Sequence, residues 1–308
     1  MSGRFLLQRL VQMALTVLLL SAVVFSLARL SGDPVLLMAP AEATAQDLDR
    51  IRARLGLDRP LLVQYWLFIK NAAAGDFGAS IKWERPALEL IIDRLPATLL
   101  LSATSMTLGL LIALPLGVAA AVWRDSWVDT VGKLVALVGQ SMPTFWFGIL
   151  LILFFALYMP IFPTSGYGTP SHIVLPTITL GAFVAAAIMR VTRSAMLDAL
   201  EADYVRTARS KGAPEGRVIL VHALKNASIP ILTITALQTA AILRGAVVTE
   251  TVFSWPGIGK IAVDAVYARD FPVVQASVLF MGLIFLAVNL IVDVIYLFLD
   301  PRISYGKR

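Results

Sequence analysis

Cysteine is absent from this chain of 308 residues, and histidine occurs only twice, as His172 and His222. Without cysteine the chain has neither a disulfide framework nor a thiolate metal site, and cysteine use gives no information about its compartment. Two histidines leave little for a metal centre or a catalytic site that depends on imidazole. Charged residues make up 15% of the chain, although a soluble domain typically carries about 25%. The scarcity of charge predicts that much of the surface faces something other than water.

Long apolar runs are what the chain has in place of charge. Hydrophobic residues make up 58% of it, and its mean hydropathy is +0.80. A helix that crosses the hydrocarbon core of a membrane needs about 20 apolar residues. Runs of that length lie at about 10–30, 97–123, 133–158, 173–195, 229–250 and 275–298. We therefore predict an all-α polytopic membrane protein with six transmembrane helices.

The first run has an alternative interpretation. A basic start at Arg4 and Arg9, an apolar stretch and the small residues around Ser26-Leu27-Ala28 resemble a cleavable signal peptide. The apolar run from Leu10 to Ala28 is, however, longer than the core of a usual signal peptide. We predict a retained helix.

The distribution of basic residues predicts the topology. Residues 160–171, between the third and fourth runs, contain no Lys or Arg. The segment around the fourth and fifth runs is rich in them: Arg190, Arg193, Arg206, Arg209, Lys211, Arg217 and Lys225. Basic loops stay in the cytoplasm, whereas a loop as long as 31–96 translocates largely regardless of its charge. Both termini are thus expected in the cytoplasm, and the net charge of +6 is assigned to cytoplasmic loops and not to nucleic-acid binding.

Residues 31–96 are expected to form an extracytoplasmic helical loop. One helix should begin at Thr44 and stop at Gly56, and a second should follow Asp58-Arg-Pro60 and end near Gly75. The loop has two interpretations, a surface that meets a delivery protein or guides substrate, and a lid that packs on the membrane helices.

Prolines and glycines punctuate the predicted membrane helices. Pro115, Pro143, Pro176 and Pro230 lie in or at the ends of the runs, and each can kink its helix. The segment Trp255-Pro256-Gly257 should break the fifth helix. Glycines allow close helix contact: Gly109, Gly117, Gly132, Gly139 and Gly148. Such helices suit a pathway that opens and closes, but ordinary bundle packing explains the same residues.

Two charges fall inside predicted membrane helices, Arg244 in the fifth and Asp293 in the sixth. Charge in a membrane is costly and often functional. Both are candidate pathway charges that face a cavity and bind a charged substrate. Alternatively, they are structural and pair with Glu250, or with Asn289 and backbone groups. They are expected at different depths, so no direct pair between them is predicted.

The polar insert before the fifth run carries the most specific pattern. Asp203 to Ser210 has helical spacing, Gly212-Ala-Pro214 ends that helix, and the apolar stretch 218–224 leads back to the membrane. A solvated charged loop is one interpretation. The other is a lever, which a partner pushes to move the two neighbouring membrane helices together.

This insert resembles the loop of importer-type permease subunits of ABC transporters, whose pattern is Glu-Ala-Ala, three residues, Gly, nine residues, then Ile-x-Leu-Pro. Arg206-Thr207-Ala208 stands at the triplet, Gly212 at the glycine, and His222-Ala223-Leu224-Lys225 at the second element. Most departures are typical of the dipeptide, oligopeptide, glutathione and nickel permeases, and of B-type dipeptide permeases in particular. Further strings match this branch along the chain: Gly32-Asp33-Pro34, Leu55-Gly-Leu-Asp58, Gly75-Asp-Phe-Gly78, Ser141-Met-Pro143, Leu175-Pro-Thr-Ile-Thr-Leu180 and Glu250-Thr-Val-Phe-Ser-Trp-Pro-Gly257.

The resemblance implies a type I ABC importer permease in the bacterial inner membrane. It implies an N-terminal segment and first helix at 1–30, the external loop at 31–96, and a core at 97–308 with a coupling loop at about 196–226. The implied coupling residues are Tyr204, Arg206, Thr207, Ala208, Lys211, Gly212, His222 and Leu224.

The implied partners are a paralogous permease, two ATPase subunits that bind ATP and magnesium, and an extracytoplasmic binding protein. This chain itself would hold no cofactor and catalyse no reaction. The expected cargo is a dipeptide or short oligopeptide, with glutathione or nickel complexes as the alternative.

Two other classes fit less well. A secondary transporter is expected to have an internal repeat and side chains that carry protons or ions in the middle of the membrane. No convincing repeat is seen in this sequence. An intramembrane enzyme would need a nucleophile with a base, but His172 and His222 are expected on opposite faces. The string Gly257-Ile-Gly-Lys260 lacks the spacing of a phosphate-binding loop.

Overall fold

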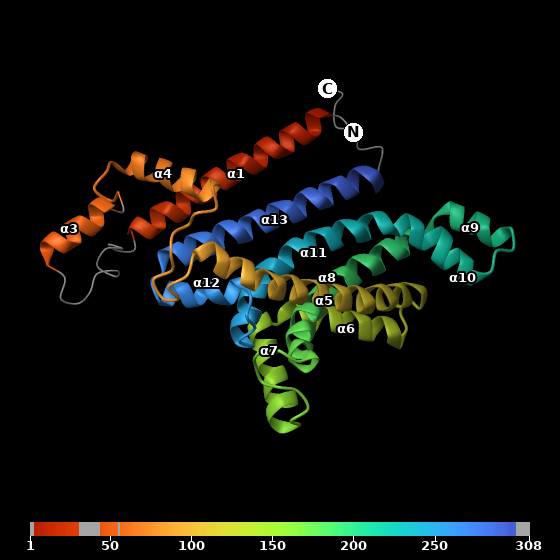
Figure 1. Ribbon diagram of the computed structural model, residues 1–308. Helices are drawn as coiled ribbons and strands as arrows, with labels where there is room; N and C mark the ends of the chain where they lie inside the picture. The colour runs from red at the N-terminus through yellow and green to blue at the C-terminus, as the bar shows by residue number, and fades with distance from the viewer. Residues whose placement is uncertain (1–2, 31–43, 55, 300–308) are drawn as a thin grey trace. The chain divides into compact units, whose positions relative to one another are not determined.

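The computed structural model describes residues 3–30, 44–54 and 56–299, and their regular structure is helical apart from one isolated bridge between Ala79 and Pro86 (Figure 1). The elements, in chain order, are α1 (Gly3–Leu30), α3 (Ala45–Arg54), α4 (Leu61–Ala73), α5 (Ala87–Val122), α6 (Trp127–Ser141), α7 (Thr144–Ile152), the π-helix η1 (Leu153–Tyr158), the 3₁₀-helix η2 (Pro170–Ile173), α8 (Val174–Glu201), α9 (Asp203–Ser210), α10 (Glu215–Arg217), the π-helix η3 (Val218–Ala223), α11 (Leu224–Val252), α12 (Ile258–Tyr267) and α13 (Phe271–Leu299). The all-α prediction is confirmed.

Five helical segments are long and apolar enough to cross a membrane: Leu7–Leu30, Ala87–Val122, Pro170–Glu201, Glu215–Val252 and Phe271–Val292. A sixth candidate is the bent pair formed by Trp127–Ser141 and Thr144–Tyr158. These agree with the six predicted runs, although α5 begins at Ala87, well before the predicted start at 97, because its first turns are helical but not uniformly apolar.

The third predicted run, 133–158, is not one straight helix, and this corrects the sequence-based expectation. Its two halves meet at an angle of 104°. The break lies at Met142, whose backbone is extended (φ −88°, ψ 130°). The residue before a proline is pushed out of the helical region, and Pro143 has no N–H to continue the ladder. Pro115 and Pro230, in contrast, lie inside α5 and α11, which continue through them.

The chain divides into two compact units, Met1–Ala97 with Pro256–Ala287, and Thr98–Trp255 with Val288–Arg308. In the first unit, α4 packs on α1 through aromatic side chains. The ring of Phe25 lies 5.4 Å from that of Tyr65 and 5.7 Å from that of Phe68, and the Tyr65 hydroxyl donates to the carbonyl of Leu18 at 3.0 Å. The opposite face of α4 is exposed, with Leu62 at 82% and Trp66 at 65%. One face of α4 therefore packs on α1, and the other is exposed.

The helix ends predicted within residues 31–96 are confirmed. The backbone N–H of Thr44 donates to the Asp47 carboxylate at 3.1 Å, at the start of α3. Gly56 and Gly75, the predicted stops, have φ of +66° and +83°, which glycine adopts at little cost. Leu48 and Ile51 are the apolar residues expected on one face of the first of these helices, and their side chains lie outside the described residues. Leu55 and Gly32-Asp33-Pro34 also lie outside the described residues.

A buried carboxylate joins the segment before α5 to the start of α13. Asp270 is fully buried, and it accepts from the Ser80 hydroxyl at 2.5 Å and from the backbone N–H of Lys82 at 3.0 Å. It also accepts from the N–H of Val273 at 3.4 Å, in the first turn of α13. Ser80 in turn accepts from the N–H of Trp83 at 2.8 Å. This network ties the loop before α5 to the first turn of α13.

Replacing Asp270 by alanine is expected to destabilise this unit by about 2 kcal/mol, because it leaves the buried Ser80 hydroxyl and the Lys82 N–H without an acceptor. Limited proteolysis should then cut between residues 78 and 86 faster than in the unaltered chain. Ser80→Ala removes the hydrogen bonds to Asp270 and from Trp83. It should have a smaller effect, because the Asp270 carboxylate still accepts from the N–H groups of Lys82 and Val273. Equal proteolysis rates for all three chains would contradict this role of Asp270.

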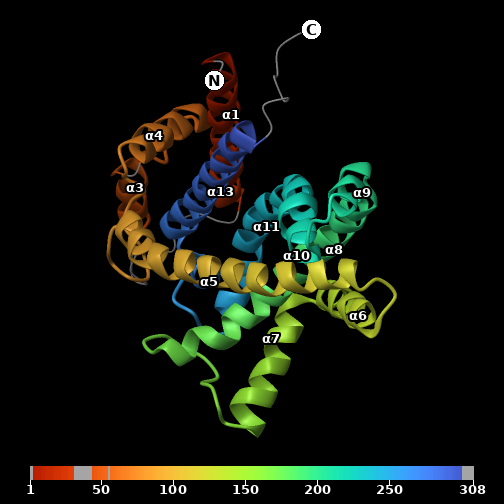
Figure 2. The ribbon, with the colours of Figure 1, turned by 90° about the vertical axis from the view of Figure 1, so that its right-hand side faces the viewer.

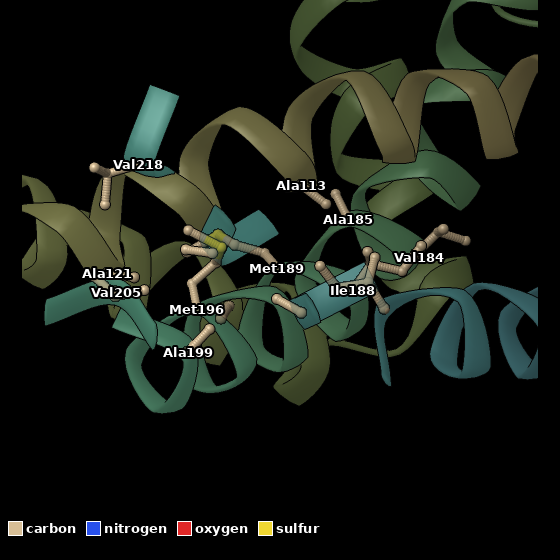
Figure 3. Packing of buried hydrophobic residues seen from close by; sticks show 14 of the residues in the cluster. Ala113, Ala121, Val184, Ala185, Ile188, Met189, Met196, Ala199, Val205 and Val218 are labelled. Carbon is tan, nitrogen blue, oxygen red and sulfur yellow. The ribbon is translucent and has the colours of Figure 1, made fainter. Parts of the chain in front are cut away.

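The second unit is organised around α8. In its apolar window 61% of the residues are buried, against 33% for the corresponding windows of α5 and α11. Met189 and Met196 of α8 pack with Ala113 and Ala121 of α5 in one continuous core (Figure 3). Helix α11 runs alongside α8, so α8 is covered on several sides.

Two glycines allow α5 to approach α8 closely. A Cβ at Gly109 would come within 2.7 Å of the side chain of Val184, and one at Gly117 within 2.7 Å of the side chain of Thr192. Any larger residue at these positions would force the helices apart. The predicted role of these glycines in close helix contact is confirmed.

Candidate functional site

The loop between α8 and α11 is built around α9, which has the bounds predicted from the sequence, Asp203–Ser210. It ends in a Schellman motif, in which the N–H of Ala213 donates to the carbonyl of Ala208 at 3.2 Å and that of Gly212 to the carbonyl of Arg209 at 2.9 Å. Gly212 has φ of +76°, and a Cβ added there would meet nothing within 4 Å. The glycine is therefore explained by backbone conformation and not by lack of space.

An ion pair between Arg209 and Glu215 spans the same turn on its exposed side. Nε of Arg209 lies 2.8 Å from Oε1 of Glu215, and its Nη2 lies 3.3 Å from Oε2. Both side chains are largely exposed, so the pair contributes at most about 1 kcal/mol. Its geometry nevertheless ties the end of α9 to the start of α10.

Helix α9 has one buried and one exposed face. Val205 is fully buried, and Ala208 packs half-buried against the core that contains Val218 and Met196. The exposed side chains belong to other predicted coupling residues: Tyr204, Arg206, Thr207 and Lys211. The exposed face is polar and basic and available to a partner, whereas the buried face joins α9 to the core of its unit.

The second element of the predicted coupling pattern is turned partly inward. His222 is half-buried in the π-helix η3, and Leu224, at the start of α11, packs against the core. His222, Leu224 and Ala208 are all half-buried, and the last two pack against the core. These three residues therefore attach the loop to its unit and contribute little to the exposed surface. Figures 1 and 2 show α9 and α10 together at one end of the α8 and α11 pair.

A buried ion cluster lies near the start of α6. The carboxylate of Asp129 is fully buried and meets Arg193 of α8 in a bidentate pair, with Oδ1–Nε at 2.5 Å and Oδ2–Nη2 at 2.8 Å. Nζ of Lys133 lies 2.9 Å from Oδ2, and the N–H of Asp125 donates to the same oxygen at 3.1 Å. The cluster connects α6 to the part of α8 that leads into α9.

Sequence reasoning missed Asp129 and counted Arg193 only as a cytoplasmic charge. A signal was present, because Ser126 and Asp129 have the spacing of a helix cap. Ser126 is indeed the N-cap of α6 and accepts from the N–H of Asp129 at 3.5 Å. The pattern indicates where a helix starts. It does not indicate that Asp129 pairs with Arg193, which lies 64 residues further along the chain.

Arg244, a candidate pathway charge, is exposed on α11 and lines a cavity at the bend between α6 and α7. It forms no ion pair with Glu250, and this excludes the pairing considered for it. Glu250 is fully buried and accepts from the Thr98 hydroxyl at 2.6 Å. The side chain of Asp293, the second candidate, lies outside the described residues. Among the residues that the structure describes, no group of His, Asp and Glu has the arrangement of a metal site.

Two family models match the chain. The model described as "Binding-protein-dependent transport system inner membrane component" matches residues 113–305. Its N-terminal companion, "Binding-prot-dependent transport system membrane comp, N-term", matches residues 2–102. Together they match most of both compact units.

Full-length relatives are also found. The chain is 45% identical over 302 residues to the glutathione transport system permease protein GsiC of Salmonella choleraesuis (strain SC-B67), covering 98% of this chain and 99% of the relative. It is 43% identical over 302 residues to GsiC of Escherichia coli (strain K12), with the same coverage.

A solved structure shares the fold. The methionine ABC transporter MetNI, in inward-facing conformations, contains a chain that superimposes with a TM-score of 0.57 at 19% identity, covering 69% of this chain and 97% of that chain. This confirms the predicted type I permease fold. The chain thus belongs to the family of binding-protein-dependent transport system inner membrane components, as a multi-pass permease subunit of an ABC importer of the peptide, glutathione and nickel branch.

Proposed function

We propose that this chain forms one half of a pathway that imports short peptides, with glutathione as the first cargo to test, and that α9 receives the movement of a cytoplasmic ATPase. From the sequence alone, glutathione was the alternative to the expected dipeptide or short oligopeptide. The relatives named as glutathione permeases, similar over nearly the full length, support this cargo.

The observation that carries the coupling role is the two-faced structure of α9. Its exposed face presents Tyr204, Arg206 and Lys211, and its buried face holds Val205 in the core shared with α5 and α8. A partner that displaces α9 would move the ends of α8 and α11 with it. The partner supplies energy through its different affinity for the two states of the permease.

In this proposal the complete importer contains a paralogous permease, two ATPase subunits that bind ATP and magnesium, and an extracytoplasmic binding protein. Both termini and the coupling loop at about 196–226 lie in the cytoplasm, as the basic residues indicate. Residues 1–30 form the anchor helix, 31–96 face the binding protein, and 97–308 form the core. This chain alone neither hydrolyses ATP nor pumps.

The cargo is tested by uptake of labelled glutathione, a dipeptide, a longer peptide and nickel, in cells with and without this chain. We expect glutathione or dipeptide uptake to be lost without the chain and restored by returning it. If all four uptakes were unchanged, the proposed cargo would be wrong while the family membership would stand.

The absence of cysteine allows a direct test of the orientation of α9. In the assembled importer, a cysteine at Thr207 is expected to crosslink to a cysteine in a co-expressed ATPase, because position 207 is exposed. A cysteine at Val205 should not, because position 205 is fully buried. Gel analysis after mild oxidation provides the measurement. Crosslinking from position 205 but not from 207 would contradict the proposed docking face.

A further inference from the structure

The bend between α6 and α7 opens a cavity of about 560 Å³, within the range of about 300–1,000 Å³ that is typical of small-molecule sites. The end of α6, the start of α7, one face of α8 and one face of α11 all contribute to its wall. The apolar part of the wall consists of Met142, Pro143, Leu180, Phe183, Ala241 and Ile242. The cavity lies within one compact unit, so its shape depends on packing inside that unit alone.

The polar part of the wall consists of hydrogen-bond donors. Arg244, Gln140, Ser141 and Thr144 line the cavity, and no Asp or Glu is among its lining residues. Arg244 makes no hydrogen bond or ion pair with any residue that the structure describes. The hydroxyls of Ser141 and Thr144 are likewise unpaired within the described chain, so each can donate to a ligand.

Gln140 is oriented by a neighbour. Its Oε1 accepts from Nη1 of Arg190 at 2.7 Å, and this contact identifies the amide oxygen. The Nε2 group remains as a donor with no partner in the described chain. Arg190 does not line the cavity, but its positive charge lies next to the lining residue Gln140. The Nε2 group of Gln140 can therefore donate to a ligand in the cavity.

A lipid-facing surface position would be energetically unfavourable for the charge of Arg244. It lies on α11, within the span Glu215–Val252, and a charge that faces lipid in such a helix is costly. A cavity that holds water or an anion removes this cost. A cationic donor with three further donors and apolar walls fits a carboxylate on a small organic molecule.

We propose that this cavity binds a carboxylate of the cargo as it passes through this subunit, with Arg244 as the charge that holds it and Gln140, Ser141 and Thr144 as additional donors. The proposal rests on the proposed function, because a free carboxylate is common to glutathione and to unmodified peptides. It makes Arg244 a specificity-determining residue for transport. Apolar side chains of the cargo would contact Phe183 and Ile242.

The test uses the complete importer in nanodiscs without its binding protein, so that only the permease cavity is probed. Met142→Cys places a single thiol of this chain in the cavity wall without removing a proposed donor. The rate of its alkylation by a maleimide is measured with and without alanyl-alanine or S-methylglutathione, neither of which has a free thiol. The matched ligands are the amide of alanyl-alanine and the diamide of S-methylglutathione, in which every free carboxylate of each peptide is blocked.

Peptides with a free C-terminal carboxylate are expected to slow alkylation, and the amides to require about tenfold higher concentrations for the same effect. Arg244→Gln in the Met142→Cys background should raise the protecting concentration of the acids about tenfold and abolish the preference over amides. Arg244→Lys should restore part of it, because it keeps the charge. Arg59→Gln, an exposed arginine in the other unit, is the control and should change nothing.

Equal protection by acids and amides, or an unchanged preference in Arg244→Gln, would overturn the proposal. Complete lack of alkylation would also overturn it, because the cavity would then be closed to water. If Arg244→Gln failed to assemble, as judged by copurification with the other subunits, the acid and amide comparison on the Met142→Cys chain would still decide. The two proposals can fail separately. If cells showed no change in peptide uptake but the alkylation assay still showed stronger protection by acids than by amides, the cargo assignment would be wrong and the carboxylate site would stand.

Discussion

Replacing Gly212 by aspartate is expected to abolish transport while leaving the importer assembled. The position has φ of +76°, which costs a residue with a side chain about 1 kcal/mol or more, and Asp and Asn tolerate it best. Apart from its two chain neighbours, no atom of the described residues lies within 4 Å of a Cβ added at Gly212. The fold should therefore survive, and the new charge would stand in the turn that ends α9, beside Lys211. Uptake of the labelled cargo and copurification of the subunits provide the measurements.

Two further variants separate charge from conformation. Gly212→Asn has nearly the shape of aspartate without its charge, so it should retain much more transport. Gly212→Val is β-branched and unsuited to this backbone, so it should disrupt the Schellman motif and loosen the end of α9. Normal uptake by Gly212→Asp would refute the coupling role, and loss of the chain from the membrane would show that the turn is needed for folding instead.

Removing one partner of the buried pair between Asp129 and Arg193 is expected to cause the largest loss of stability. Asp129 is fully buried, and the side chain of Arg193 is 21% exposed. Breaking a buried pair typically costs about 3–5 kcal/mol, because the remaining charge is left without compensation. Arg193→Ala should lower the amount of folded permease and the midpoint of its thermal unfolding. Asp129→Asn should cost less, because its amide oxygen still accepts hydrogen bonds.

A nearby exposed pair provides the matched control. Nη1 of Arg124 lies 3.0 Å from Oε1 of Glu201, with side chains 57% and 69% exposed. It also links the region of α6 to the end of α8, but as a surface pair it is worth less than about 1 kcal/mol. Glu201→Ala should therefore leave the unfolding midpoint nearly unchanged. A similar loss in Glu201→Ala and Arg193→Ala would show that burial is not the cause.

The buried pair also matters for transport, since Arg193 lies near the end of α8 that leads into α9. If the pair holds α6 and α8 together as one body, a movement of α9 is transmitted to both helices. The double variant Asp129→Ala with Arg193→Leu should recover part of the stability lost in either single variant, because no buried charge is left unpaired. Uptake by that variant, measured at equal amounts of folded protein, shows whether the connection also carries coupling.

Several local features followed from the sequence because they depend on neighbouring residues only. The start of α3 at Thr44, the stops at Gly56 and Gly75 and the bounds of α9 were predicted correctly. Caps, prolines and glycines act through backbone geometry within a few residues. The length and apolarity of the membrane helices are likewise local properties, and the family resemblance of the coupling loop is a pattern of short strings.

Tertiary structure alone decided which side chains meet and which face outward. The sequence marked Pro143 as a potential kink, but only the packing of α6 and α7 shows a bend of 104° and the cavity beside it. It marked Arg244 as a costly charge inside a membrane helix, but it did not show that α6 and α7 place hydrogen-bond donors in the same cavity wall. It placed Ala208 and Leu224 with the coupling residues, although both pack against the core. By itself the sequence determined the apolar runs long enough to span a membrane and the family to which the chain belongs. Contacts between residues far apart in the chain, such as Asp129 with Arg193, depend on how helices cross, and no local pattern encodes that.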